Sequence, residues 1–244
     1  MTHFPSIYAL DIGNTRAKLA LFVDDALHSI SFADNPDSLK LLLTHGFPIV
    51  VSNVSHTEWT DALSLLPNPI LDIQREGNLP FHSNYASPKT LGMDRICNIA
   101  ALCHPHQITQ NRLVIDIGTC VKMDFIDENN TYLGGSIAPG IQLQLNALHD
   151  YTAKLPKLSP EESFSILLGN DTHSSMQSGV MGGIHAAIQW RITEFNNRYQ
   201  NLQVYMTGGD AHYFDLVQKN NIFVDENLTL RGIYALYKIQ SLPI

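Results

Sequence analysis

The sequence has few cysteines and no long apolar run, and both scarcities exclude classes of protein. Its three cysteines, Cys97, Cys103 and Cys120, cannot all pair with one another and match no zinc-binding spacing. We therefore expect reduced thiols and a cytoplasmic location. No apolar stretch approaches the roughly 18 residues that cross a membrane, and the first residues, Met1–Pro5, lack the basic and apolar regions of a secretion signal. A membrane partner is not expected.

Basic residues are also in short supply. The chain has 15 Lys and Arg against 23 Asp and Glu, which gives a formal net charge of −8. Such a balance cannot neutralise a row of phosphates, so we expect no nucleic-acid partner, although single basic groups can still bind a small anion. With 244 residues, 44% of them hydrophobic, the chain is long enough for two domains with a core each.

One stretch, from Ala9 to Phe22, has the pattern of a phosphate-binding hairpin. An apolar run reaches Asp11, turns, and returns as an alternating run that carries Lys18, which predicts two antiparallel strands. Gly13 lacks a Cβ and lets the backbone approach a ligand closely. A carboxylate beside phosphates requires an intervening cation, so Asp11 indicates a metal-bound nucleotide. The same pattern also fits an ordinary hairpin whose polar residues serve the turn.

A second copy of this pattern favours the nucleotide. Val114–Phe125 repeats the apolar run, the Asp-Ile-Gly turn and the returning strand, and its Asp116 follows Asp11 by 105 residues, almost half the chain. Two similar hairpins at this spacing predict a duplicated nucleotide-binding domain that holds phosphates between its halves. We expect domains at 1–112 and 113–244.

Between the hairpins, the predicted element order is typical of an α/β half with a mixed sheet. The loop at 75–90 carries Tyr85 and leads into Gly92-Met93-Asp94-Arg95, which opens an apolar-periodic helix. Asp94 in a first turn is commonly a helix cap. The glycine before it and the arginine after it, whose fork can bind a carboxylate, favour a functional role. Cys97 and Cys103 fit the core of this helix.

The second half has three more glycine-containing motifs: a strand at 132–141 with Pro139 near the first turn of the following helix, Gly169-Asn170-Asp171-Thr172, and Thr207-Gly208-Gly209 after a strand. A helix is predicted from about Ser174 to Tyr199. Its glycines, Gly179, Gly182 and Gly183, suggest close packing against another helix or a second subunit.

Taken together, these motifs resemble those of the type III pantothenate kinases, of the acetate and sugar kinase/Hsc70/actin superfamily. The resemblance covers essentially the whole chain, and its motifs follow the family's order. It implies an α/β fold of two duplicated RNase H-like domains (the actin-like ATPase fold) with mixed sheets and flanking helices. The active site would then lie in the cleft between them.

The implied reaction is the ATP-dependent phosphorylation of pantothenate to 4'-phosphopantothenate, the first step of coenzyme A biosynthesis. Asp94 would be the catalytic base, as a positioned aspartate is in kinases. Pantothenate would be bound by Tyr85, Gly92, Met93, Asp94, Arg95 and Thr172. ATP, with Mg²⁺, would be bound by Asp11, Ile12, Gly13, Asn14, Thr15, Arg16, Ala17, Lys18 and Thr119.

The resemblance also implies that Asp116 ligates a monovalent cation, K⁺ or NH₄⁺, and that the protein is a homodimer with Thr172 near the partner's site. In one place the chain departs from the family. Its second phosphate motif usually continues with Ala and, two residues later, Thr, whereas this chain has Cys120 and Lys122. Lys122 would either add charge beside the phosphates or point to solvent.

Three other functions fit parts of this pattern. Another small-molecule kinase of the superfamily would keep both hairpins and change the acceptor site. A nucleotide sensor would bind ATP without acceptor-dependent turnover. A non-catalytic accessory factor of gene regulation, of the same fold, would tolerate loss of Asp94 or of the hairpins. Both phosphate hairpins and the Gly92-Met93-Asp94-Arg95 motif are present here, which favours the pantothenate kinase function over these alternatives.

Overall fold

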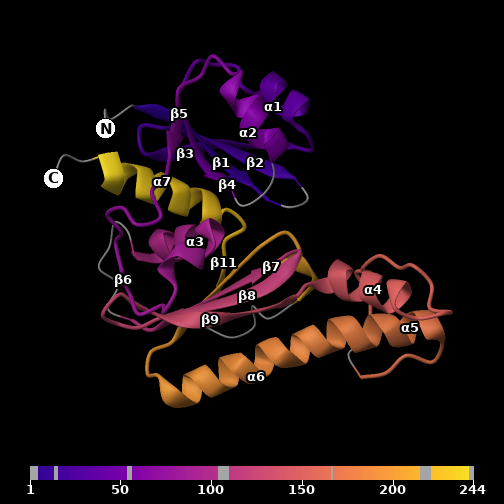
Figure 1. Cartoon of the computed structure of the whole chain (residues 1–244). Helices are drawn as coiled ribbons and strands as arrows, with labels where there is room; N and C mark the ends of the chain where they lie inside the picture. Colours follow the sequence, from indigo (N-terminus) through magenta and orange to yellow (C-terminus); the bar gives the residue numbers. More distant parts are fainter. Residues whose placement is uncertain are drawn as a thin grey trace. The chain divides into compact units, whose positions relative to one another are not determined.

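The computed structural model describes residues 5–13, 16–53, 57–103, 110–165, 167–214 and 221–241. These residues form an α/β fold with mixed sheets (Figure 1). The chain divides into two compact units, one comprising Met1–Thr109, Asn130–Tyr132 and Asn227–Ile244, the other Gln110–Asn129 and Leu133–Glu226. The first change of unit lies close to the expected boundary at 112. The expected domains nevertheless differ from these units, because the chain returns to the first unit twice.

The first unit is built on a five-stranded sheet of order β3-β2-β1-β4-β5. Strands β1–β2 and β2–β3 pair antiparallel, and β1–β4 and β4–β5 pair parallel. The predicted hairpin is thus confirmed as β1–β2. The elements of this unit are β1 (Ser6–Ile12), β2 (Ala17–Val23), β3 (Ala26–Ala33), α1 (Pro36–Leu42), β4 (Ile49–Asn53), α2 (Thr57–Ser64), β5 (Ile70–Asp72), β6 (His82–Ser83), a 3-10 turn η1 (Pro88–Thr90), α3 (Met93–Cys103) and α7 (Leu228–Ser241).

Strand β1 is buried on both of its faces. Ile7, Tyr8, Ala9 and Leu10 are each at most 3% exposed, which is the continuous apolar pattern of a central strand rather than the alternating pattern of a half-exposed one. Helices α3 and α7 pack closely on each other, since a Cβ at Gly232 of α7 would overlap the Cys97 carbonyl of α3. Cys97 and Cys103 are buried free thiols, as predicted.

The second unit contains most of a six-stranded sheet of order β11-β10-β7-β8-β9-β6. Strands β7 and β8 form the second predicted hairpin, and β7 pairs parallel with β10 on its other side. The elements are β7 (Arg112–Ile117), β8 (Cys120–Ile126), β9 (Thr131–Pro139), α4 (Ile141–Asp150), α5 (Thr172–Gln177), a π-helical turn η2 (Ser178–Gly182), α6 (Gly183–Arg198), β10 (Gln203–Thr207), a 3-10 turn η3 (Ala211–Tyr213) and β11 (Ile222–Val224).

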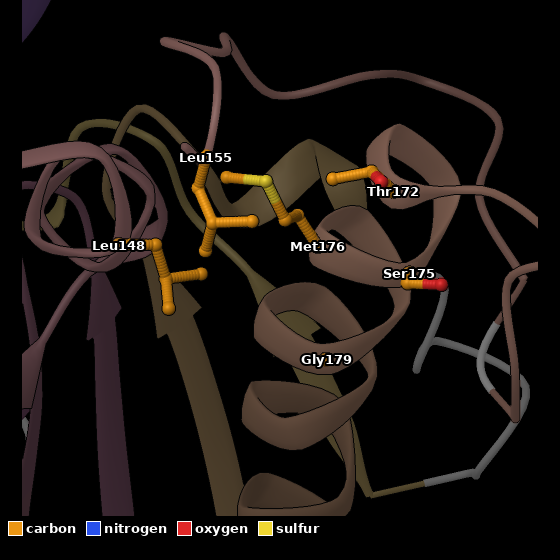
Figure 2. A pocket seen from close by; sticks show the side chains of 6 residues that line it. All are labelled: Leu148, Leu155, Thr172, Ser175, Met176 and Gly179. Atoms are coloured by element: carbon orange, nitrogen blue, oxygen red, sulfur yellow. The ribbon is translucent and has the colours of Figure 1, made fainter. Parts of the chain in front are cut away.

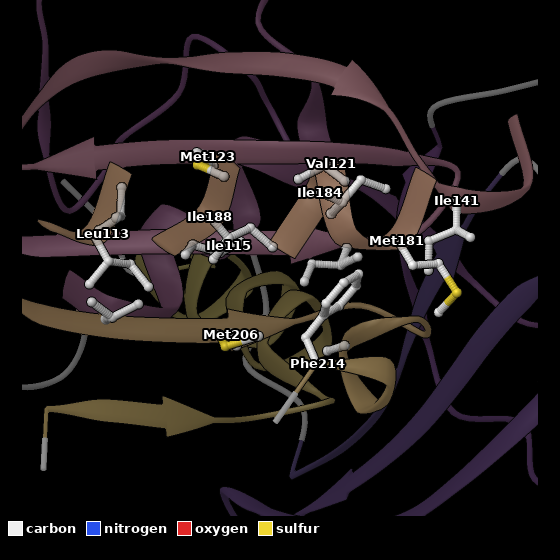
Figure 3. Close-up of a cluster of buried hydrophobic side chains, with 14 of the residues drawn as sticks. Leu113, Ile115, Val121, Met123, Ile141, Met181, Ile184, Ile188, Met206 and Phe214 are labelled. Carbon is white, nitrogen blue, oxygen red and sulfur yellow. The ribbon is translucent and has the colours of Figure 1, made fainter. Parts of the chain in front are cut away.

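Helix α6 covers one face of this sheet. Ile184 and Ile188 of α6 point toward Ile115, Met123 and other apolar side chains of β7, β8 and β10 (Figure 3).

The two central strands, β1 of the first sheet and β7 of the second, have the same kinds of neighbouring strand. Strand β1 lies between its hairpin partner β2 and the parallel β4, and β7 lies between β8 and the parallel β10.

Pro139 lies near the first turn of the helix after β9, as predicted: it is the last residue of that strand and stands directly before Gly140, the N-cap of α4. The structure corrects one sequence prediction in this unit. The single helix expected from Ser174 to Tyr199 is instead α5, a π-helical turn and α6. A Cβ at Gly179 or Gly183 would meet nothing within 4 Å, so these glycines do not mark close packing inside the chain.

No helix in the described part of the chain combines the length and the apolar character that a membrane span requires.

Candidate active site

Asp94 lies in the first turn of α3, as predicted. Its Oδ1 accepts a hydrogen bond of 2.9 Å from the Arg95 amide, and the residue is half-buried. A Cβ at position 92 would collide with this same oxygen, so Gly92 leaves the room that the carboxylate needs. Asp94 therefore does bond a backbone amide at the helix start. That contact holds the carboxylate in one position and does not exclude a chemical role.

Arg95 and Tyr85, two predicted substrate residues, are brought together by a third residue that the motifs do not include. Arg95 is buried, and its Nη2 donates to the Tyr132 hydroxyl at 2.7 Å. The guanidinium carbon lies 5.7 Å from the centre of the Tyr85 ring, and the Tyr85 and Tyr132 rings are 5.8 Å apart. Cation–π attraction and the charge-assisted hydrogen bond together orient the guanidinium.

A second residue missed from sequence, Arg75, fixes the loop before Gly92. Its Nη1 donates to the Lys89 carbonyl at 2.9 Å and also contacts the Leu91 carbonyl. Because these carbonyls belong to the three residues before Gly92, Arg75 stabilises the approach of the chain to α3. The only sequence signal was an arginine at the start of a long loop.

Asp11 and Asp94 lie around the same buried thiol, although they are far apart in sequence. Burial raises the pKa of Cys97 well above its ordinary value, and the negative charge of Asp11 raises it further, with Asp94 contributing in the same direction. The nearby hydroxyl of Ser52 acts in the opposite direction and lowers the pKa of Cys97. Ser52 is also the β4 register partner of Asp11. The first unit thus gathers both carboxylates at the ends of β1 and β4 and the start of α3.

The basic groups of the first hairpin gather over one aromatic ring. The Arg16 guanidinium lies 4.3 Å and the Lys18 ammonium 5.5 Å from the centre of Phe32, which is 48% exposed. The Gly13 amide donates to the Arg16 carbonyl at 3.2 Å and closes the turn. Asn14 and Thr15 lie outside the described residues. Ile12 and Ala17 are fully buried, so their side chains belong to the core of the first unit.

The turn of the second hairpin is held by two other glycine motifs. The Gly140 amide donates to the Thr119 carbonyl at 2.9 Å, and the Asp210 amide donates to the Ile117 carbonyl at 3.0 Å. A Cβ at Gly140 would overlap the Gly118 carbonyl. Gly208 has a φ of +96°, and a Cβ there would overlap the backbone of Ile117. Three motifs distant in sequence therefore meet around the turn from Ile117 to Thr119.

Asp116 forms an ion pair with the residue that departs from the family pattern. Lys122 is its register partner on β8, and the Lys122 Nζ lies 2.7 Å from the Asp116 Oδ2. On the other side, a Cβ at Gly208 would lie 2.7 Å from the Asp116 Oδ1. A K⁺ or NH₄⁺ ion at Asp116 would have to share the carboxylate with an ammonium group. The residues present do not fit the monovalent cation that the resemblance implies.

Thr172 belongs to the second unit, whereas Tyr85, Gly92 and Arg95 belong to the first. It is the first residue of α5, and Asp171 caps that helix by accepting from the Ser174 amide at 2.8 Å. Hydrogen bonds from Ser174 lower the pKa of the Asp171 carboxyl. Thr172 lines a pocket of about 480 Å³ with residues of α4, α5 and the following turn (Figure 2); the other lining residues are Leu148, Leu155, Ser175, Met176 and Gly179.

Comparison with known families gives a match over most of the chain. The family model described as type III pantothenate kinase matches residues 7–194. A type III pantothenate kinase of Flavobacterium psychrophilum is 38% identical over 243 residues, which cover 96% of this chain and 100% of that protein. One of Bacteroides fragilis is 36% identical over 230 residues, covering 92% and 94%.

Solved structures share the fold. A protein from Campylobacter jejuni described as a Baf family transcriptional activator matches with a TM-score of 0.64 and 21% identity, over 95% of this chain and 97% of that one. The activator of the 2-hydroxyisocaproyl-CoA dehydratase from Clostridium difficile, solved with bound ADPNP, matches with a TM-score of 0.53 and 15% identity, over 96% and 95%. At these identities the likeness concerns the fold alone.

Proposed function

Since this chain belongs to the type III pantothenate kinase family, we propose that it transfers the γ-phosphoryl group of ATP to the primary hydroxyl of pantothenate. The products are 4'-phosphopantothenate and ADP, and the reaction is the first step of coenzyme A biosynthesis. The observation that carries this proposal is the placement of Asp94, whose carboxylate is held at the start of α3 by the Arg95 amide and has room only because residue 92 is glycine.

Asp94 acts as the general base. It accepts the proton of the pantothenate hydroxyl as that oxygen bonds to the γ-phosphorus, and the bond from the phosphorus to the ADP oxygen breaks. Because phosphoryl transfer depends chiefly on positioning and charge stabilisation, a carboxylate held in one orientation is well suited to this step.

Pantothenate carries a carboxylate, an amide and hydroxyls, so it needs charged and neutral donors. We assign its binding to Tyr85, Gly92, Met93, Asp94, Arg95 and Thr172. The planar guanidinium of Arg95, oriented by Tyr132 and Tyr85, is the group best suited to an anion. The buried Met93 shapes the start of α3.

ATP is assigned to the turns of the two hairpins. The groups assigned to its phosphates are Asp11, Ile12, Gly13, Asn14, Thr15, Arg16, Ala17, Lys18 and Thr119. Turn amides and the charges of Arg16 and Lys18 attract phosphate oxygens. The carboxylate oxygens of Asp11 are the hard ligands that Mg²⁺ prefers, so Asp11 would hold the ion, which offsets phosphate charge when bound.

We further propose that the two halves are duplicated RNase H-like domains. Support comes from the shared surroundings of β1 and β7, each between a hairpin partner and a parallel strand. A cytoplasmic location is proposed on the three free cysteines.

A homodimer is the proposed assembly. Support comes from the apolar side chains that the second unit exposes on and near α4 to α6, namely Tyr151 (88%), Leu167 (89%), Leu168 (69%) and Trp190 (60%). The exposed Gly179 and Gly183 would allow a second helix to approach closely.

The reaction and its base are tested by ADP release with Mg-ATP, with and without pantothenate, in wild type and Asp94→Asn. We expect pantothenate-dependent turnover whose kcat falls about 100- to 10,000-fold in the variant. Asparagine keeps the oxygen that accepts from the Arg95 amide, so the thermal midpoint should change little. Unchanged turnover in the variant would remove Asp94 as the base. ATP binding without any turnover in wild type would instead favour the accessory-factor or sensor function.

A further inference from the structure

The ion pair between Asp116 and Lys122 is a specific, largely buried interaction and not a loose contact at the surface. The two residues face each other directly across β7 and β8, where opposite charges stabilise the pair. Their N–O distance is 2.7 Å, and their side chains are only 18% and 12% exposed. The surface pair Lys40–Asp37 has a longer distance, 3.0 Å, and exposures of 46% and 89%. Solvent therefore screens the Asp116–Lys122 pair far less.

Both oxygens of the Asp116 carboxylate have close neighbours. The Oδ2 faces the Lys122 ammonium, and the Oδ1 lies against the backbone of Gly208, where even a Cβ would come within 2.7 Å. Thr207, the register partner of Asp116 on the parallel strand β10, is also buried. A second cation on this carboxylate would meet both the like charge of Lys122 and little room beside Gly208.

The first hairpin has the same arrangement of charges across its strands. Lys18 is the register partner of Asp11, as Lys122 is of Asp116. Each turn that is assigned to ATP phosphates is therefore preceded by an aspartate and followed by a lysine on the opposite strand. A lysine at this place is thus compatible with a phosphate-binding hairpin in this chain.

We propose that the Lys122 ammonium takes the place of the monovalent cation at Asp116, so that the protein binds ATP and phosphorylates pantothenate without K⁺ or NH₄⁺. The Lys122 ammonium and the monovalent cation each carry one positive charge, and Lys122 places this charge beside Asp116 from strand β8 of the protein itself. The inference rests on the proposed kinase function. It concerns the requirement for a monovalent cation and not the reaction itself, because a kinase of this family could equally need the free ion.

The first experiment measures pantothenate-dependent ADP formation in buffer free of K⁺ and NH₄⁺, with KCl replacing choline chloride at constant ionic strength. We expect the wild-type rate to change less than about twofold, whereas Lys122→Thr loses about tenfold or more in choline chloride and recovers with KCl. Lys40→Thr, which removes a lysine from the exposed pair with Asp37, is the matched control and should behave as wild type. Strong stimulation of the wild type by KCl, or full activity of Lys122→Thr without KCl, would overturn the proposal.

A second readout does not depend on turnover. The Kd for ATP and the thermal midpoint are measured in KCl and in choline chloride for wild type, Lys122→Thr and Lys122→Arg. KCl should tighten ATP binding and raise the midpoint only in Lys122→Thr, since arginine keeps the charge. If wild type binds ATP tightly only in KCl, the inference fails. If it binds ATP equally in both salts but never phosphorylates pantothenate, the kinase proposal fails and the inference about the cation stands.

Discussion

At the scale of single residues, the orientation of Arg95 depends on one hydroxyl group. Tyr132 is fully buried, and its hydroxyl accepts from the Arg95 Nη2 at 2.7 Å. Tyr85 contacts the same guanidinium through its ring. An arginine positioned by two aromatic residues loses little freedom when it binds an anion, which favours affinity for the substrate.

Tyr132→Phe removes that hydroxyl and keeps the ring. A buried donor of Arg95 then lacks this acceptor, so we expect a loss of stability of about 1–3 kcal/mol and a rise of about three- to tenfold in KM for pantothenate. The measurements are steady-state kinetics and denaturant unfolding. Tyr205→Phe, which removes a hydroxyl with an equally short bond to Gln203, is the control and should leave KM unchanged. An unchanged KM in Tyr132→Phe would show that Tyr132 does not position Arg95 for the substrate.

The three thiols differ in burial, and their reactivity should differ accordingly. Cys120 is partly exposed, whereas Cys97 and Cys103 are buried, and burial with nearby Asp11 raises the pKa of Cys97. Because the thiolate is the reactive form, Cys97 stays protonated and inert at neutral and mildly alkaline pH.

An aromatic disulfide reagent should therefore label one thiol rapidly in the native protein and all three after unfolding. The fast phase should disappear in Cys120→Ser. Rapid labelling that survives this substitution would mean that helix α3, which carries Cys97 and Cys103, opens to solvent.

At the scale of elements, the second phosphate turn is supported by glycines on two other segments. Gly208 combines a positive φ with a backbone in contact with Ile117, so a side chain there would be both strained and crowded. Gly134 also has a positive φ, +125°, but a Cβ there would meet nothing within 4 Å. Substitutions at Gly134 and Gly208 therefore distinguish the effect of backbone strain alone from the effect of strain combined with steric crowding.

Gly208→Ala should displace the turn at Gly118 and weaken ATP binding by about tenfold or more, with a loss of stability above the roughly 1–3 kcal/mol of backbone strain alone. Gly134→Ala should cost only the strain and leave the Kd for ATP unchanged. Calorimetric ATP titration and thermal unfolding measure both effects. Equal ATP affinity in the two variants would contradict a supporting role for Gly208.

Elements defined by local pattern were predictable from the sequence, and those that depend on distant contacts were not. The hairpins around Asp11 and Asp116 follow from alternation and turn residues that lie within about a dozen positions. Tyr132 could not be found this way, since its partner Arg95 is 37 residues distant and the pairing arises only when β9 enters the first unit. The π-helical turn likewise has no periodic signal beyond its glycines.

At the scale of the whole molecule, the division of the chain is less simple than two consecutive halves. The duplicated hairpins predict domains at 1–112 and 113–244, whereas the first compact unit runs to Thr109 and takes up two further segments. The final helix α7 packs on α3 and β1, and Thr229 donates to Asn98 at 2.8 Å. Repetition in sequence shows how many similar parts exist. It does not show which part the last helix will join.

The proposed homodimer is tested by replacing an apolar side chain of the second unit. Trp190→Asp places a charge where 60% of a tryptophan is exposed, so we expect sedimentation to shift from dimer to monomer. Activity should fall with it, because Thr172 is proposed to act near the partner's site. Leu41→Asp, at an 82% exposed leucine of the first unit, should remain dimeric and active. A wild type that sediments as a monomer would refute the assembly.

The π-helical turn between α5 and α6 fixes the direction in which Thr172 points. A π turn contains one residue more than an α-helical turn and absorbs it within that turn, whereas each residue of a regular α-helix advances the rotation by about 100°. Thr172 precedes the turn and Trp190 lies beyond it. Deleting one residue from Ser178–Gly182 would restore a continuous α-helix and leave the two side chains at nearly the same angle to each other. Winding all of the present residues as a regular α-helix would instead rotate the two side chains relative to each other by about 100°. The π turn itself therefore sets the angular offset between a proposed substrate residue and a proposed subunit contact.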